Sequence, residues 1–175
     1  MTQNETARGL VHIYCGDGKG KTSCAAGLAL RAAHSGMQVA ILQFLKDGTS
    51  HEMQALAALP NVTVLAGKVC EAFFWNMTDQ EKTATRRLHD ELLDKAAALP
   101  CDLLVLDEAC AAVNLKLVDT DKLRALLDRS DRPETVLTGR DPADFLLDRA
   151  DYITEMVKRR HPFDKGIPAR EGIEF

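Results

Sequence analysis

Seven residues near the start of the chain have the types and spacing of a phosphate-binding loop. They are Gly16, Asp17, Gly18, Lys19, Gly20, Lys21 and Thr22. Glycines let the backbone turn tightly, so that successive N–H groups point into one concavity that attracts an anion. We expect Lys19, Lys21 and the loop amides to hold phosphate oxygens, Ser23 to lie among the nucleotide contacts, and the Thr22 hydroxyl to bind Mg²⁺.

The segments on either side of this loop support the same interpretation. An apolar run, 10–14, precedes it and predicts a strand, while the alanine-rich run 23–33 predicts a helix that begins where the loop ends. The free N–H groups at such a helix start add to the attraction for phosphate. The strict pattern has glycine where this chain has Cys15, and the alternative is a glycine-rich turn that happens to carry lysines.

Two carboxylates follow a second apolar run. Residues 103–106 are Leu-Leu-Val-Leu, and Asp107 and Glu108 come directly after them. A buried strand that ends in acids beside a phosphate loop can supply oxygen ligands to Mg²⁺, directly or through water. The alternative is that Asp107 only caps the segment that follows.

Aromatic and basic residues supply further candidates. Phe73, Phe74 and Trp75 are adjacent, so they cannot all face one core. The loop that carries them could pack against a large flat ligand, or the three rings could cover the sheet edge. Arg140 follows an expected strand end, where an arginine can meet phosphate. Arg31 lies on the otherwise apolar first helix, where it needs a partner such as ribose or a carboxylate. The cluster that ends in His161 is basic and is otherwise typical of a solvated face.

These residues are spread over strands that alternate with helices. We expect strands at 10–14, 38–45, 62–65, 103–106, 135–138 and 152–157. Helices are expected from Thr22 to His34, after capping boxes at Thr49–Glu52 and Thr78–Glu81, at 120–129, and after an Asp141 cap. In the long helix that starts near residue 78, Ala84, Leu88 and Leu92 mark the expected buried face.

The alternation predicts an α/β fold of one domain. We expect a P-loop NTPase-like (RecA-like) fold, with a mostly parallel sheet of about six strands, the first of them central, and helices on both faces. The ligand site is expected at the carboxyl edge of the strands.

Composition limits the class of protein. The chain has 175 residues, 46% hydrophobic and 27% charged, with a net charge of −4, which argues against general nucleic-acid binding. Five cysteines, an odd number without a C-x-x-C pair, indicate reduced thiols in the cytoplasm. Residues 1–9 form a short polar segment without the apolar core of a signal peptide, residues 10–175 form the domain, and no run is long enough to cross a membrane.

Six motifs together resemble a known family. The loop 16–22, Gln43-Phe44-Leu45-Lys46, Phe73-Phe74-Trp75, Leu106-Asp107-Glu108, Thr138-Gly139-Arg140 and the tail 161–167 occur in the order found in the P-loop type of ATP:cob(I)alamin adenosyltransferase. The resemblance covers residues 9–175. It implies transfer of the 5′-deoxyadenosyl group of ATP to the Co(I) of a reduced corrinoid, with release of triphosphate.

The resemblance also implies roles for single residues. Thr22 and Glu108, with Asp107 beside them, would meet Mg²⁺, while Lys21 and Glu108 would act in catalysis. Gly16 to Ser23, Arg31, Arg140 and His161 would lie on the ATP side, with Arg31 at the ribose. Phe73 and Trp75 would face the corrinoid and displace the lower axial ligand of cobalt. The family further implies a homodimer and a flavoprotein reductase as partner.

Three departures from the family pattern stand out. Cys15 and Phe74 each occupy a position where threonine is common, and the segment before the first strand is shorter than the N-terminal helix that covers the site in many relatives. Two other functions stay open at this point. One is a different P-loop phosphotransferase or ATPase, and the other is a nucleotide-dependent corrinoid-binding module.

Overall fold

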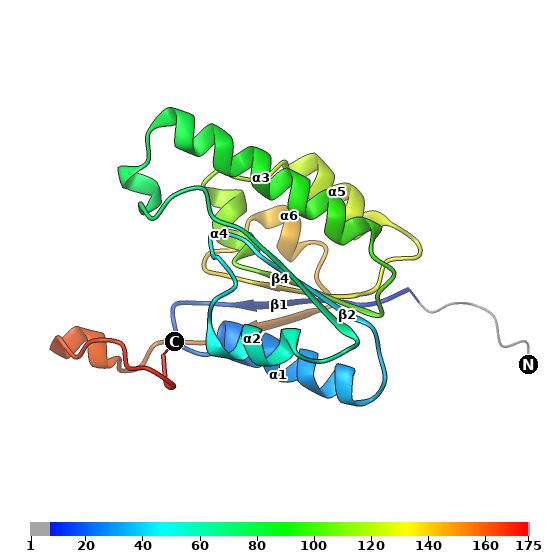
Figure 1. The fold of residues 1–175 in the computed structure, drawn as a ribbon, viewed down its shortest axis with the longest axis horizontal. Helices are drawn as coiled ribbons and strands as arrows, with labels where there is room; N and C mark the ends of the chain where they lie inside the picture. The colour runs from blue at the N-terminus through cyan, green and yellow to red at the C-terminus, as the bar shows by residue number, and fades with distance from the viewer. Residues whose placement is uncertain (1–7, 175) are drawn as a thin grey trace, which may run out of the picture.

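A computed structural model of the chain describes residues 8–174, so the expected polar segment 1–9 falls largely outside it. Its centre is a six-stranded sheet in which all neighbouring strands are parallel (Figure 1). The strands are β1 (Val11–Cys15), β2 (Val39–Gln43), β3 (Val62–Ala66), β4 (Leu103–Asp107), β5 (Glu134–Thr138) and β6 (Tyr152–Glu155). Their order across the sheet is β3-β2-β4-β5-β1-β6.

Helices cover both faces of this sheet (Figure 1). α1 (Lys21–His34) and α2 (His51–Ala57) lie on one face; α3 (Asp79–Ala98), α4 (Ala109–Asn114), α5 (Thr120–Asp128) and α6 (Asp144–Leu147) lie on the other. Two short 3₁₀ helices, η1 (Phe74–Asn76) and η2 (Pro162–Lys165), complete the fold. Within residues 8–174, no helix is both long and apolar enough to span a bilayer.

The buried strands explain why the sheet is parallel. All five residues of β2 and of β4 are buried, because helices pack on both of their faces. Such strands carry continuous apolar runs rather than an alternating pattern. The predicted fold class is therefore confirmed. The expectation that the first strand is central is wrong, since β6 pairs outside β1 and leaves β1 second from the edge.

Helix starts were predicted with mixed success. The capping box at Thr78 is confirmed, with the Thr78 hydroxyl accepting from the Glu81 N–H and the Glu81 carboxylate accepting from the Thr78 N–H. The box at Thr49 is wrong: the Thr49 hydroxyl donates to Asp47, and α2 begins after Ser50. A local turn to the preceding aspartate therefore replaces the cap.

Two further helix predictions need correction, and one helix was missed. α6 begins at Asp144 after an Ala143 cap, and Asp141 instead adopts a left-handed backbone with φ 48°. α4 was not predicted at all. On α3 the buried face lies one residue further along than expected, because Ala84 is exposed while Thr85 and His89 are buried together with Leu92.

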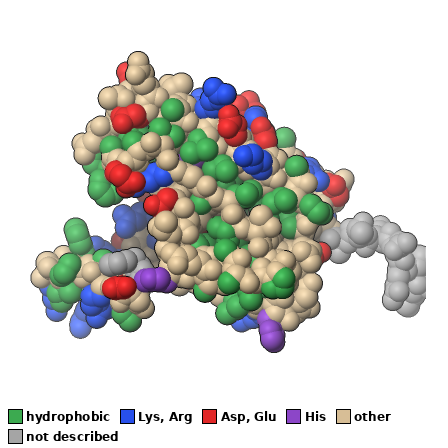
Figure 2. Space-filling model, viewed as in Figure 1, with side chains coloured by type: hydrophobic (Ala, Val, Ile, Leu, Met, Phe, Trp, Pro, Cys, Tyr) green, Lys and Arg blue, Asp and Glu red, His purple; other side chains and the backbone are tan. Residues whose placement is uncertain are grey.

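Parallel strands bring all their carboxyl ends to one edge, at the left in Figure 1. The loops that leave this edge carry the residues singled out by the sequence. Figure 2 shows the same side hollowed between the start of α3 and the C-terminal tail, with charged side chains in the hollow. The candidate site is therefore built where the fold class predicts a ligand.

Candidate functional site

The loop between β1 and α1 can be built only with glycine at its narrow points. Gly16 and Gly20 adopt φ of 93° and 114°, which side chains rarely tolerate. A Cβ on Gly16 or Gly18 would lie 2.6 or 2.5 Å from the Met156 carbonyl oxygen. The loop therefore packs directly against the chain that follows β6, and the Gly18 N–H donates to the Met156 carbonyl at 2.6 Å.

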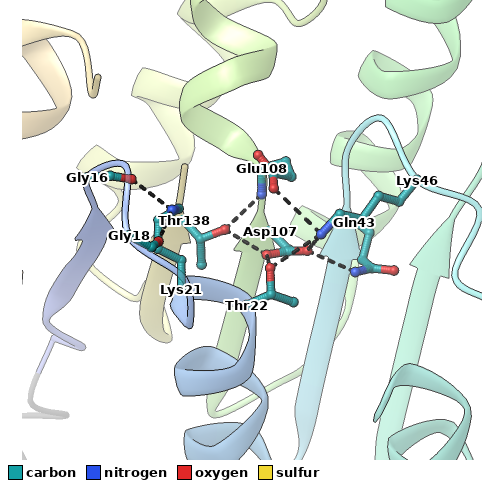
Figure 3. A network of polar contacts seen from close by, with 9 residues as sticks. All are labelled: Gly16, Gly18, Lys21, Thr22, Gln43, Lys46, Asp107, Glu108 and Thr138. Atoms are coloured by element: carbon teal, nitrogen blue, oxygen red, sulfur yellow. Dashed lines mark hydrogen bonds and ion pairs between the residues drawn. The ribbon is translucent and has the colours of Figure 1, made fainter. Parts of the chain in front are cut away.

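Lys21 lies inside this loop rather than reaching into solvent (Figure 3). Its Nζ donates to the carbonyl oxygens of Gly16 at 2.7 Å and Gly18 at 2.8 Å. Burial, and after it the charge of Arg140, lower the pKa of Lys21 from its ordinary value. Two cations thus face the same space, as the binding of a polyanion requires.

Asp107 is the centre of a buried polar network (Figure 3). Its side chain is fully enclosed, and four donors bond to its carboxylate. Thr22 and Thr138 hydroxyls donate to Oδ1 at 2.9 and 2.7 Å, and Gln43 Nε2 and Lys46 Nζ donate to Oδ2 at 2.8 and 2.7 Å. Because its acceptor sites are occupied, Asp107 orients Thr22 and Lys46 and is not free to point into the cavity.

Charge compensation keeps this buried pair ionised. Burial alone would raise the pKa of Asp107, but the charge and hydrogen bond of Lys46, together with the hydrogen bonds from Thr138 and Gln43, outweigh it and the pKa is lowered. Burial likewise opposes ionisation of Lys46, yet the charge of Asp107 raises the pKa of the lysine overall. In the sequence, Lys46 stood out only as part of a motif. Its ion pair with Asp107 was not predicted, because that contact depends on the pairing of β2 with β4.

Glu108 is the carboxylate that reaches the cavity. It adopts a left-handed backbone, with φ 60°, and its N–H donates to the Thr138 hydroxyl at 2.9 Å. This turn separates Glu108 from the buried strand, so the side chain is only partly covered and lines the cavity. The Lys46 ammonium lies 3.6 Å from Glu108 Oε1.

The oxygen atoms here suit Mg²⁺. Among residues 8–174 there is no cluster of three or more His, Cys, Asp and Glu side chains able to hold a metal. Mg²⁺ usually binds through one or two protein oxygens, with phosphates and waters completing its shell. The Thr22 hydroxyl and the Glu108 carboxylate, next to a phosphate loop and already facing one cation, fit that requirement.

The main cavity has a volume of about 940 Å³. Its polar wall includes most of the residues predicted for the ATP side: Asp17, Gly18, Lys19, Gly20, Lys21, Thr22, Ser23, Glu108, Arg140 and His161. An apolar wall is contributed by α1 and α2, among them Leu30, Ala55 and Leu56. Gly16 does not line the cavity. Arg31 is exposed on α1 and does not line it either, so its ribose contact stays a prediction.

The three adjacent aromatic side chains differ in their exposure, as expected for neighbours that cannot all face one core. Phe73 and Trp75 are 69% and 75% exposed, and their rings stack with centroids 5.5 Å apart. Phe74 is partly covered and carries Lys82 Nζ over its ring at 5.0 Å. Rings that cover a sheet edge would be buried, so the exposure of Phe73 and Trp75 favours the ligand interpretation over the packing one.

A row of cavities joins the aromatics to the phosphate loop. One of about 390 Å³ is lined by Phe73, Trp75 and His89, and an intermediate one of about 420 Å³ shares Leu45 with it. The intermediate cavity in turn shares Lys46 with the main cavity. The segment after β2 therefore lies between the two halves of the candidate site.

The C-terminal tail reaches the phosphate loop from the other side. Lys19 Nζ donates to the Ile173 carbonyl at 2.9 Å and bonds to Glu174 at 3.1 Å. Glu174 also accepts from Arg170, and these contacts lower the pKa of Glu174 to about 2. The Glu174 carboxylate thus forms an ion pair with Lys19, a lysine that the sequence predicts to hold phosphate.

Comparison with known proteins gives one consistent result. Residues 7–175 match the family described as ATP:corrinoid adenosyltransferase BtuR/CobO/CobP. The chain is 32% identical over 182 residues to a corrinoid adenosyltransferase of Pseudomonas aeruginosa, with 100% of this chain and 88% of the relative covered. It is 28% identical to corrinoid adenosyltransferases of Escherichia coli K12 and Salmonella typhimurium, covering 100% of this chain and 90% of each relative. Because the match extends over nearly every residue, the chain belongs to the ATP:corrinoid adenosyltransferase family.

Proposed function

We propose that this protein transfers the 5′-deoxyadenosyl group of ATP to the Co(I) of a reduced corrinoid and releases triphosphate. The observation that carries the proposal is the row of cavities from the phosphate loop to the exposed Phe73–Trp75 pair. A phosphotransferase or ATPase would account for the loop and the acids. It would leave two stacked, exposed aromatic rings beside the same edge without a use.

The proposed reaction is a displacement at carbon. The Co(I) electron pair forms a bond to C5′ of the ribose, the C5′–O bond breaks, and its electrons leave with the triphosphate. Co(I) is already a strong nucleophile, so the protein needs no general base. Its tasks are to align cobalt with C5′ and to stabilise the charge of the departing triphosphate.

The ATP side has residues for the second task. Lys21 is fixed at the centre of the loop, and Lys19 and Arg140 face the same cavity. Mg²⁺ would be held by Thr22 and Glu108, with Asp107 orienting the Thr22 hydroxyl. When bound there, the ion would neutralise part of the phosphate charge.

The corrinoid side has residues for desolvation. Phe73 and Trp75 present two large apolar rings at the mouth of the smaller cavity. Rings of this kind can exclude water and the axial ligand from one face of cobalt, which makes Co(II) easier to reduce. The proposal also includes a flavoprotein reductase and a homodimer, which the family resemblance implies, and a cytoplasmic location, which the five cysteines without a C-x-x-C pair indicate.

Product identity tests the proposal directly. The purified protein is incubated with ATP, Mg²⁺ and a chemically reduced corrinoid, and the phosphate products are separated by ion exchange. We expect triphosphate in a one-to-one ratio with the alkylated corrinoid, whose cobalt–carbon bond is detected by its light-sensitive absorption spectrum. ADP as the main product would overturn the proposal in favour of phosphoryl transfer, and absence of any product would favour a binding module.

A further inference from the structure

Lys46 occupies the space that the proposed function assigns to the metal. Its ammonium lies 2.7 Å from Asp107 Oδ2, 3.3 Å from Thr22 Oγ1 and 3.6 Å from Glu108 Oε1 (Figure 3). The hydroxyl and one of these carboxylates are the oxygens expected to bind Mg²⁺, and the other carboxylate orients the hydroxyl. A cation of the chain itself therefore already lies among them.

The backbone holds this lysine in place. Leu45, the residue before it, has φ 60°, a conformation that costs energy for leucine. The Leu45 N–H donates to Nε2 of the buried His89 at 3.1 Å, and His89 Nδ1 bonds to the Leu117 carbonyl at 2.9 Å. The strained turn is thus fixed from α3, which makes the position of Lys46 a built feature rather than one of many positions of a mobile side chain.

Two cations cannot share one small set of oxygens without strong repulsion. A divalent ion that approaches Asp107 and Glu108 must therefore displace the Lys46 ammonium or bind weakly. Lys46 also lines the main cavity, so a triphosphate bound there offers the ammonium other anionic partners. ATP would thus supply both new ligands for the metal and a new partner for the lysine.

From this geometry we infer that Lys46 is an internal counter-ion that keeps free divalent cations away from Glu108 and Thr22 until ATP arrives. The inference rests on the proposed metal site. It makes Lys46 a positioning residue that couples metal binding to nucleotide binding. In the nucleotide-free protein the acidic pair is neutralised by the chain, and in the loaded protein by the metal.

Binding of Mn²⁺, measured by electron paramagnetic resonance on the full chain, tests this inference without any turnover. For the wild-type protein we expect weak binding of free Mn²⁺ and tight binding in the presence of ATP. Lys46→Gln keeps a hydrogen-bond donor for Asp107 but removes the charge, so free Mn²⁺ should bind at least about tenfold more tightly. Lys46→Arg, which keeps the charge, should bind free Mn²⁺ as weakly as the wild type.

The controls separate the possible failures. Lys122→Gln removes an exposed lysine that pairs with Asp94 on the opposite helical layer and should leave Mn²⁺ binding unchanged. Unchanged free-Mn²⁺ affinity in a folded Lys46→Gln protein overturns the inference. Glu108→Gln tests the proposed metal site on which the inference rests. If this variant binds Mn²⁺ with ATP as tightly as the wild type, that metal site is wrong.

Discussion

At the scale of single residues, the turn from β1 through the glycine-rich loop into α1 was the easiest feature to predict. It is made by seven consecutive residues, so the local sequence contains all that its geometry needs, while phosphate binding by the loop stays a prediction. Asp107 and Glu108 were found in the same way, because they follow an apolar strand. Their division into one enclosed carboxylate and one that reaches the cavity was not predictable, since it depends on the left-handed turn at Glu108.

The loop lysine gives the first prediction. Lys21→Ala removes a charge held 2.7 and 2.8 Å from two loop carbonyls and should slow adenosyl transfer by about 10²- to 10³-fold at saturating ATP, the usual cost of one lost contact to a developing anion. Steady-state turnover with a reduced corrinoid measures the effect. Lys122→Ala, on the surface, serves as the matched control. A Lys21→Ala protein that turns over normally would mean that the phosphates bind elsewhere.

At the scale of helices and strands, patterns with a local cause were predicted and those with a tertiary cause were not. The Thr78–Glu81 box forms within one helical turn, and it was confirmed. The buried face of α3 was misjudged because it includes the polar residues Thr85 and His89. His89 is buried because it bonds to two backbone groups, on the segment after β2 and at Leu117, and no periodicity signals such distant partners.

His89 gives a prediction on stability and pH. Burial lowers its pKa below the ordinary value near 6.5, so the native protein keeps it neutral, with Nε2 accepting from Leu45. Below about pH 6.5 the unfolded chain takes up a proton that the folded chain does not, and stability therefore falls as the pH falls. His89→Gln does not titrate, so its free energy of unfolding should decrease less between about pH 7 and about pH 5.

Urea denaturation at both pH values measures this difference. The loss of unfolding free energy should be smaller in His89→Gln than in the wild type by roughly 1.4 kcal/mol for each unit by which the native pKa of His89 lies below its unfolded value. His34→Gln, on the exposed end of α1, is the control and should retain the wild-type loss. An equal loss in His89→Gln and the wild type would show that protonation of His89 contributes nothing to acid sensitivity.

At the scale of the whole molecule, the sheet brings the two halves of the site to one edge. The alternation of strands and helices predicted that edge, but it did not predict the strand order, because β6 pairs beyond β1 through contacts distant in sequence. The aromatics follow β3 at one end of the sheet, whereas the phosphate loop follows β1 near the other end. Because the two halves of the candidate site are separated in this way, a substitution on the corrinoid side should leave ATP binding intact, and one on the ATP side should leave corrinoid binding intact.

Trp75 tests that separation. Trp75→Ala should leave ATP affinity nearly unchanged, because the ring does not line the main cavity. It should impair adenosylation that starts from Co(II), where the cobalt geometry must change before reduction, and impair it much less with prepared Co(I). Rates from both cobalt states and ATP binding by calorimetry measure these effects. Tyr152→Ala removes a half-exposed aromatic ring on β6 and is the control. Equal losses from both cobalt states would argue for a purely structural aromatic pair.

If Lys19 holds phosphate as proposed, its contact with the tail means that the nucleotide competes with part of the chain for the site. If the tail covers the loop about nine-tenths of the time, the apparent Kd for ATP is about tenfold weaker than that of the open loop. Glu174→Gln weakens the closed form by removing the carboxylate charge that meets Lys19, so it should lower the apparent Kd in calorimetry. Glu171→Gln, a neighbour that does not bond to Lys19 in the described structure, is the control. On the same proposal, the competition would help to expel triphosphate after the reaction, because Glu174 would pair with Lys19 again each time the product leaves.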